Sequence, residues 1–83
     1  LSRSRPNAIH GKPTKLISNS DVGTMELQAK ATTQGVTILW IPDRFGVPTI
    51  TGKNSTLSAL KKVVGGYLVD VKVNGNYTII VNL

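Results

Sequence analysis

The chain has 83 residues, enough for one small domain, and it contains no cysteine, which excludes disulfide bonds and cysteine-ligated zinc. No apolar run approaches the roughly 20 residues of a transmembrane helix, so no membrane-spanning segment is expected. Ten Lys and Arg against four Asp and Glu give a formal net charge of +6. This charge favours an anionic partner such as nucleic acid or an acidic membrane, or it serves solubility alone.

The first 22 residues are mostly polar and include two prolines. They show neither the two-residue period of a strand nor the 3.6-residue period of a helix. We therefore interpret residues 1–22 as a basic arm that precedes a small domain of residues 23–83. The basic residues of this arm are Arg3, Arg5, Lys12 and Lys15.

Two strands are predicted next. Residues 24–31 alternate apolar and polar side chains, the period of a half-buried strand, although the same residue types also favour a short helix. Residues 36–42 are β-branched and aromatic and predict a strand that is buried on both faces and ends at Pro42. The following segment, rich in Gly and Pro, predicts a loop with a short extended piece at residues 48–51.

One helix is predicted, beginning at Asn54 or Ser55 as its N-cap. Its apolar face would consist of Leu57, Leu60, Val63 and Val64. Lys61 and Lys62 would complement the negative end of the helix dipole, and Gly65 would end the helix in the left-handed conformation.

The C-terminal residues 67–82 predict a β-hairpin. A three-residue loop, Val73-Asn74-Gly75, would keep the apolar side chains of both strands on one face. That face should pack against the helix and consists of Tyr67, Val69, Val71, Tyr77, Ile79 and Val81. The predicted fold is therefore α+β: a small, mainly antiparallel sheet of order β-β-α-β-β, with one helix packed on one face and a basic N-terminal arm.

No group of residues predicts catalysis. The single histidine, His10, lies in the polar arm without a second metal ligand near it, and the four acids are scattered along the chain. We therefore expect no enzymatic activity, no metal site and no small-molecule cofactor.

The basic residues instead suggest phosphate contacts, which give sequence-independent, salt-sensitive binding. We predict that nucleic acid contacts Arg3, Arg5, Lys12, Lys15 and Lys53. Other protein subunits are the alternative partners.

Residues 36–67 also show a family likeness, with the most specific part at residues 57–67. The pattern Leu-x-x-Leu-x-x-x-Val-Gly-Gly-Tyr is formed by Leu57, Leu60, Val64, Gly65, Gly66 and Tyr67. It resembles the helix-to-strand junction of a small domain of unknown function that is encoded by bacteriophages and other mobile elements. The resemblance implies a viral or mobile-element origin and no catalytic residues.

These observations predict a non-enzymatic binding module whose arm engages an anionic partner, most plausibly nucleic acid. The alternative is a structural or virion-like assembly protein that uses the arm and an exposed sheet edge for subunit contacts. A secreted, membrane-active, toxin-like polypeptide is a third class.

Overall fold

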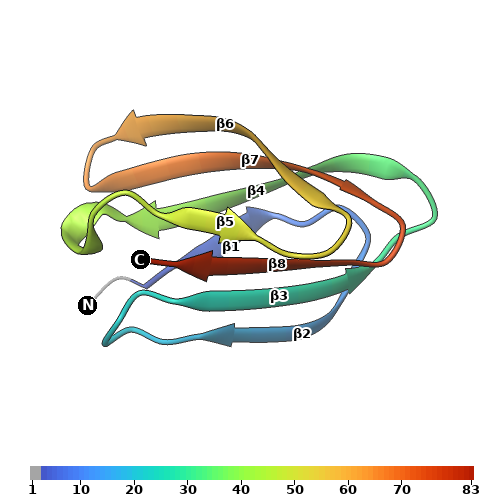
Figure 1. The fold of residues 1–83 in the computed structure, drawn as a ribbon, viewed down its shortest axis with the longest axis horizontal. Coiled ribbons are helices and arrows are strands. Elements are labelled where there is room, and N and C mark those ends of the chain that lie inside the picture. The colour runs from blue at the N-terminus through green and yellow to red at the C-terminus, as the bar shows by residue number, and fades with distance from the viewer. Residues whose placement is uncertain (1–2) are drawn as a thin grey trace.

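The computed structural model describes residues 3–83, which form an antiparallel β-sandwich with no α-helix in this range (Figure 1). The strands are β1 (Arg5–Ala8), β2 (Lys12–Ser18), β3 (Met25–Lys30), β4 (Gln34–Pro42), β5 (Thr49–Thr51), β6 (Ser55–Val63), β7 (Gly66–Asn74) and β8 (Tyr77–Asn82). The described part contains one helix, the single-turn 3₁₀ helix η1 (Asp43–Phe45). It contains no helix of the length and hydrophobicity that crossing a membrane requires.

Two four-stranded sheets face each other. Sheet A has the order β1-β4-β7-β6, and sheet B has the order β2-β3-β8-β5. Every neighbouring pair is antiparallel. The predicted strands at residues 24–31 and 36–42 are confirmed as β3 and β4, and the extended piece predicted at residues 48–51 contains β5. The prediction that residues 36–42 are buried on both faces is wrong, because Val36 is 46% exposed and the outward face of β4 is only partly covered.

The core lies between the sheets and is built from alternate residues of four strands. In β3, β4, β7 and β8 the inward side chains are apolar because a strand directs every second residue to the same face. The fully or almost fully buried apolar residues are Met25, Leu27, Ala29, Leu39, Ile41, Val69, Val71, Val73, Tyr77, Ile79 and Val81. Burial of these side chains is the main stabilising contribution available to a chain without disulfides.

Polar groups inside the sandwich are paired. The Tyr77 hydroxyl donates to the His10 carbonyl oxygen at 2.6 Å and lies 2.7 Å from the Thr37 hydroxyl, which accepts from the His10 N–H at 3.1 Å. Tyr77 belongs to sheet B and Thr37 to sheet A. This network therefore joins both sheets to the connection between β1 and β2.

The prediction of an α+β fold is wrong, because residues 55–63 form strand β6 and not a helix. Gly65 has the predicted positive φ of 80°, but it ends a strand in the two-residue turn between Val63 and Gly66, which pair with each other. A helix of about ten residues is marginal without a packed face. As a strand, the same residues complete sheet A by pairing along β7.

The predicted C-terminal hairpin is also wrong, although the face assignment is confirmed. Val69, Val71, Ile79 and their alternating neighbours do point into the core. However, β7 pairs with β4 and β6, whereas β8 pairs with β3 and β5. The chain therefore crosses from one sheet to the other at residues 75–76, and the apolar face packs against the opposite sheet.

The basic arm of the predicted fold is replaced by two strands. Within residues 1–22, β1 joins the edge of sheet A and β2 the edge of sheet B. The buried Ser4 ties the start of the chain to the β2–β3 connection. Its hydroxyl donates to the Gly23 carbonyl oxygen at 2.7 Å, and its carbonyl oxygen accepts from the Ser18 hydroxyl at 2.6 Å. Strand pairing at a sheet edge uses backbone groups, so it requires no apolar period.

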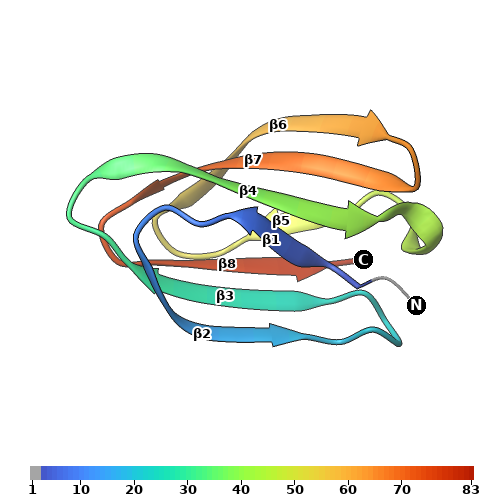
Figure 2. The same cartoon turned by 180° about the vertical axis from the view of Figure 1, so that it is seen from behind.

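The two ends of the sandwich differ in their connections. Because the strands are antiparallel, the connections β1–β2, β3–β4, β5–β6 and β7–β8 all lie at one end, and each crosses between the sheets. The β2–β3 and β6–β7 turns, η1 and the C-terminus lie at the other end (Figures 1 and 2).

Candidate anion-binding site

Four exposed lysines lie at the end of the sandwich where the four cross-sheet connections lie. Lys12 begins β2, Lys30 ends β3, Lys53 lies in the β5–β6 connection, and Lys72 is close to the end of β7. We call this region, defined by Lys12, Lys30, Lys53 and Lys72, the basic end.

The basic end contains no acidic residue. Asp21 and Asp43 lie at the opposite end, in the β2–β3 connection and in η1. Asp70 lies in the middle of sheet A, opposite Ile38 and Ala59. Glu26 lies in β3, a central strand of sheet B, opposite Ile80. The positive potential of the four lysines is therefore not neutralised locally.

Two of these lysines are direct cross-strand partners. Lys12 and Lys30 stand opposite each other in the β2–β3 pair. Like charges at this spacing are destabilising. A bound anion would relieve this repulsion, so the pair favours an anionic ligand.

Except for Lys61, the cations at the opposite end are engaged within the protein. Lys62 pairs with Asp43 at 2.7 Å, and Arg44 donates to the Ser20 carbonyl oxygen at 2.9 Å. The Arg5 guanidinium lies 4.4 Å from the centre of the Trp40 ring, within the range of a cation–π contact. By contrast, within residues 3–83 none of the four ammonium groups of the basic end is hydrogen bonded or paired with an acid.

Backbone hydrogen bonds fix the connections that hold Lys53. Lys53 and Thr78 exchange two bonds, each N–H donating to the other residue's carbonyl oxygen at 3.0 Å. The Asn54 side chain donates to the Asn76 carbonyl oxygen at 2.8 Å, and the Asn74 N–H donates to the Asn54 carbonyl oxygen at 3.1 Å. The β5–β6 and β7–β8 connections therefore form one fixed unit at the basic end.

Shallow hollows that include polar side chains flank this unit on both sides. The hollow on the sheet A side has a volume of about 340 Å³ and is lined by Gln34, Asn54, Ser55, Thr56, Lys72, Val73 and Asn74. The hollow on the sheet B side has a volume of about 190 Å³ and is lined by Thr14, Gln28, Ala29, Lys30, Lys53, Asn76, Tyr77 and Thr78. Amide and hydroxyl groups beside ammonium groups are suited to phosphate and sugar oxygens.

The structure divides the five residues predicted to contact nucleic acid into two groups. Lys12 and Lys53 belong to the basic end, and Lys15 lies next to it on β2. Arg5 lies at the opposite end of the sandwich, and Arg3 donates to the Ser18 carbonyl oxygen there, at 3.5 Å. The five residues therefore do not form one surface.

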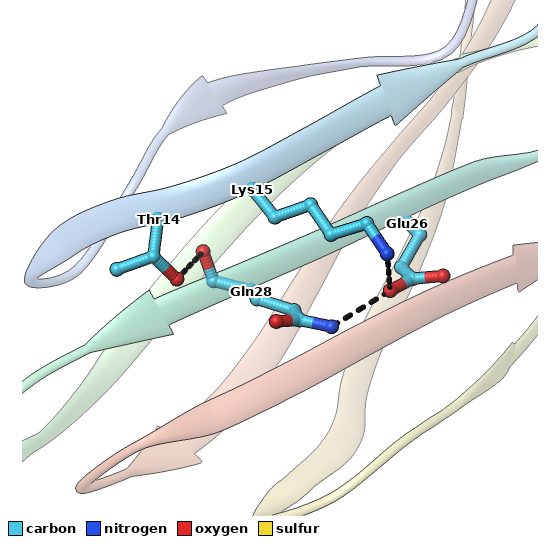
Figure 3. A network of polar contacts seen from close by, with 4 residues as sticks. All are labelled: Thr14, Lys15, Glu26 and Gln28. Carbon is cyan, nitrogen blue, oxygen red and sulfur yellow. Dashed lines mark hydrogen bonds and ion pairs between the residues drawn. The ribbon is translucent and has the colours of Figure 1, made fainter.

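Lys15 takes part in a small polar network on the outer face of sheet B (Figure 3). Its ammonium group lies 3.2 Å from the Glu26 carboxylate, which also accepts a hydrogen bond from the Gln28 side chain at 2.8 Å. The Gln28 hydrogen bond, followed by the Lys15 contact, lowers the pKa of Glu26 below its ordinary value of 4.5. Glu26 thus holds Lys15 away from the basic end.

This network predicts the pH dependence of stability. A carboxylate whose pKa is lower in the folded than in the unfolded state stabilises the fold above the unfolded pKa. We expect Glu26→Gln to be less stable than wild type at pH 7, and we expect this difference to be smaller at pH 3, because the stabilisation decreases as Glu26 becomes protonated below pH 4.5. Urea unfolding at both pH values measures the difference. Asp70→Asn is the control, and an equal loss for Glu26→Gln at both pH values would contradict the assignment.

Sequence reasoning missed two members of the basic end, Lys30 and Lys72. Both stand at outward positions of correctly predicted strands, beside Ala29 and Val71, which point inward. Their outward direction was available from the alternation. Their proximity was not, because it depends on which ends of the strands meet.

Within residues 3–83, no three His, Asp or Glu side chains lie close enough together to hold a metal ion. Comparison with known proteins found no match to this chain among family models, curated proteins or solved structures.

Proposed function

We propose that the protein is a non-enzymatic binding module that holds the phosphate groups of nucleic acid at the basic end. The observation that supports this proposal is that Lys12, Lys30, Lys53 and Lys72 lie at one end of the sandwich, without an acid among them. Lys12 and Lys30 lie on the outer face of sheet B, and Lys72 lies on the outer face of sheet A. The mobile-element origin suggested by residues 57–67 is a separate proposal and does not contribute to this one.

The mode of binding follows from the side chains present. Ammonium groups contact phosphates as point charges and do not identify bases. The one aromatic side chain that lines the hollow on the sheet B side belongs to Tyr77, which is buried and whose hydroxyl bonds inside the sandwich. Binding should therefore depend on phosphate contacts and not on base stacking, and it should be insensitive to sequence.

Salt dependence tests the proposal. Three or four phosphate contacts on duplex DNA correspond to a slope of log K against log salt of about −3 to −4, which is a loss of roughly 40- to 150-fold in affinity between 50 and 200 mM salt. Fluorescence anisotropy with two unrelated duplexes of equal length measures this slope and the expected lack of sequence preference.

Variants locate the contact. Lys30→Gln should reduce the slope by about 0.9, the contribution of one phosphate, whereas Lys61→Gln, an exposed lysine of β6, should leave it unchanged. Affinity that does not change with salt would refute the proposal, as would equal effects of the two variants.

A further inference from the structure

The four sheet edges of the sandwich are unequally protected against pairing with another strand. β1 is four residues long and contains Pro6, and β5 is three residues long. β2 contains Pro13, two lysines and an irregularity of register. Short length, proline, charge and bulges all discourage edge-to-edge association.

β6 is the least protected of these edges. It is the longest edge strand, with nine residues, and it contains no proline. Its first six residues, 55–60, carry no charge, and its protection consists of a bulge between Leu57 and Ala59 and of Lys61 and Lys62. Among the described residues, one side of β6 pairs with β7 and the other side has no neighbouring strand (Figures 1 and 2).

Apolar side chains on β6 are left partly uncovered. Leu57 and Leu60 stand opposite Val71 and Val69, so they lie on the inward face of sheet A. Their exposed fractions are 44% and 38%, whereas their partners are fully buried. The reason is that β5, the strand of sheet B on this side, is too short to cover the whole of β6.

The charge distribution along β6 identifies the partner that fits. The strand has an uncharged half, residues 55–59, and a half that contains Lys61 and Lys62. In a parallel pair of two such strands, lysines would lie beside lysines. In an antiparallel pair related by a twofold axis near Ala59, the lysines of each strand lie along the uncharged half of the other.

We propose that β6 pairs antiparallel with β6 of a second copy of this chain. Such pairing joins the two A sheets into one continuous sheet and brings Leu57 and Leu60 of both copies together on its inward face. It also satisfies the free backbone groups of both edges. Since β6 begins beside Lys53, the two basic ends lie at opposite ends of the dimer.

Cysteine scanning tests the geometry cleanly because the chain has no cysteine. Residues that face their own copy across an antiparallel pair have Cα atoms about 5 Å apart, within the range of a disulfide. The single variant Ala59→Cys should therefore form a disulfide-linked dimer under mild oxidation. Ser55→Cys and Val63→Cys should not, because each lies about 27 Å from its copy.

Sedimentation equilibrium then tests the association without a cross-link. Wild type should show a monomer–dimer equilibrium, Leu60→Lys should weaken it at least tenfold, and the matched edge variant Leu16→Lys on β2 should not. Circular dichroism confirms that each variant is folded, and Ala59→Lys replaces Leu60→Lys if the latter is not.

A wild-type chain that is monomeric at 1 mM would overturn the proposal. The remaining partner for the edge of β6 would then be a strand of a different protein. Equal cross-linking at residues 55, 59 and 63 would also overturn it, since that result requires a parallel arrangement.

Discussion

Replacing Gly52 with alanine is expected to destabilise the protein by about 3 to 5 kcal/mol, a large part of the stability of a domain of this size. Gly52 has a φ of 139°, which residues with a β-carbon rarely adopt. A β-carbon there would also lie 1.9 Å from the Thr78 carbonyl oxygen. Strain of about 1 to 2 kcal/mol and a steric cost of similar or larger size add together.

The collision involves backbone atoms that have little freedom to move. The Thr78 carbonyl oxygen already accepts from the Lys53 N–H at 3.0 Å and from the Ser55 hydroxyl at 2.9 Å. An alanine at residue 52 would push apart the β5–β6 and β7–β8 connections, which form one fixed unit at the basic end. We therefore expect Gly52→Ala to weaken polyanion binding as well as the fold.

Gly75→Ala is the matched control. Gly75 also has a positive φ, of 62°, but a β-carbon at that position meets no atom within 4 Å. The expected loss is therefore about 1 to 2 kcal/mol, from backbone strain alone. Urea unfolding of the three proteins measures both effects. If both variants lost the same free energy of unfolding, the close approach of residue 52 to the Thr78 carbonyl oxygen would not be the reason for glycine at residue 52.

Alternation predicted which side chains are buried but not which strands pair. The inward residues Val69, Val71, Ile79 and Val81 follow from a two-residue period, which is a local property. A hairpin and a crossover between facing sheets direct these side chains inward equally well. The choice between them depends on the partners β4 and β3, which lie far away in the sequence.

The segment at residues 55–63 shows how tertiary pairing overrides a helical pattern. Leu57 and Leu60 are spaced for one face of a helix, and in the structure both lie on one face of a strand because a bulge at residue 58 shifts the register between them. Nothing in the local sequence distinguishes these two arrangements. The bulge is stable because β7 provides a partner along the whole length of β6.

The candidate site was partly predictable for the same reason. Lys12 and Lys53 were identified as exposed cations from composition and loop context. Arg3 and Arg5 were included with them because an arm has no fixed position, and the structure places them at the opposite end from Lys12. Lys30 and Lys12 are 18 positions apart and become neighbours through the pairing of β2 with β3.

The variant Lys12→Gln/Lys30→Gln/Lys53→Gln should lower the affinity for duplex DNA by roughly 100- to 1,000-fold at 50 mM salt, because it removes three phosphate contacts. It should also be slightly more stable than wild type. Removal of the Lys12–Lys30 repulsion contributes about 0.2 to 1 kcal/mol at low salt. Anisotropy and urea unfolding measure the two effects.

Opposite signs of the two effects distinguish a binding surface from a structural one. A variant that lost affinity because it was poorly folded would also lose stability, whereas this variant should gain stability as it loses affinity. The matched control is Arg3→Gln/Arg5→Gln/Lys61→Gln, which lowers the net charge of +6 by the same three units. It removes cations outside the basic end, so it should change affinity by less than about tenfold. If the two triple variants lost affinity equally, binding would depend on net charge and not on the position of the lysines at the basic end.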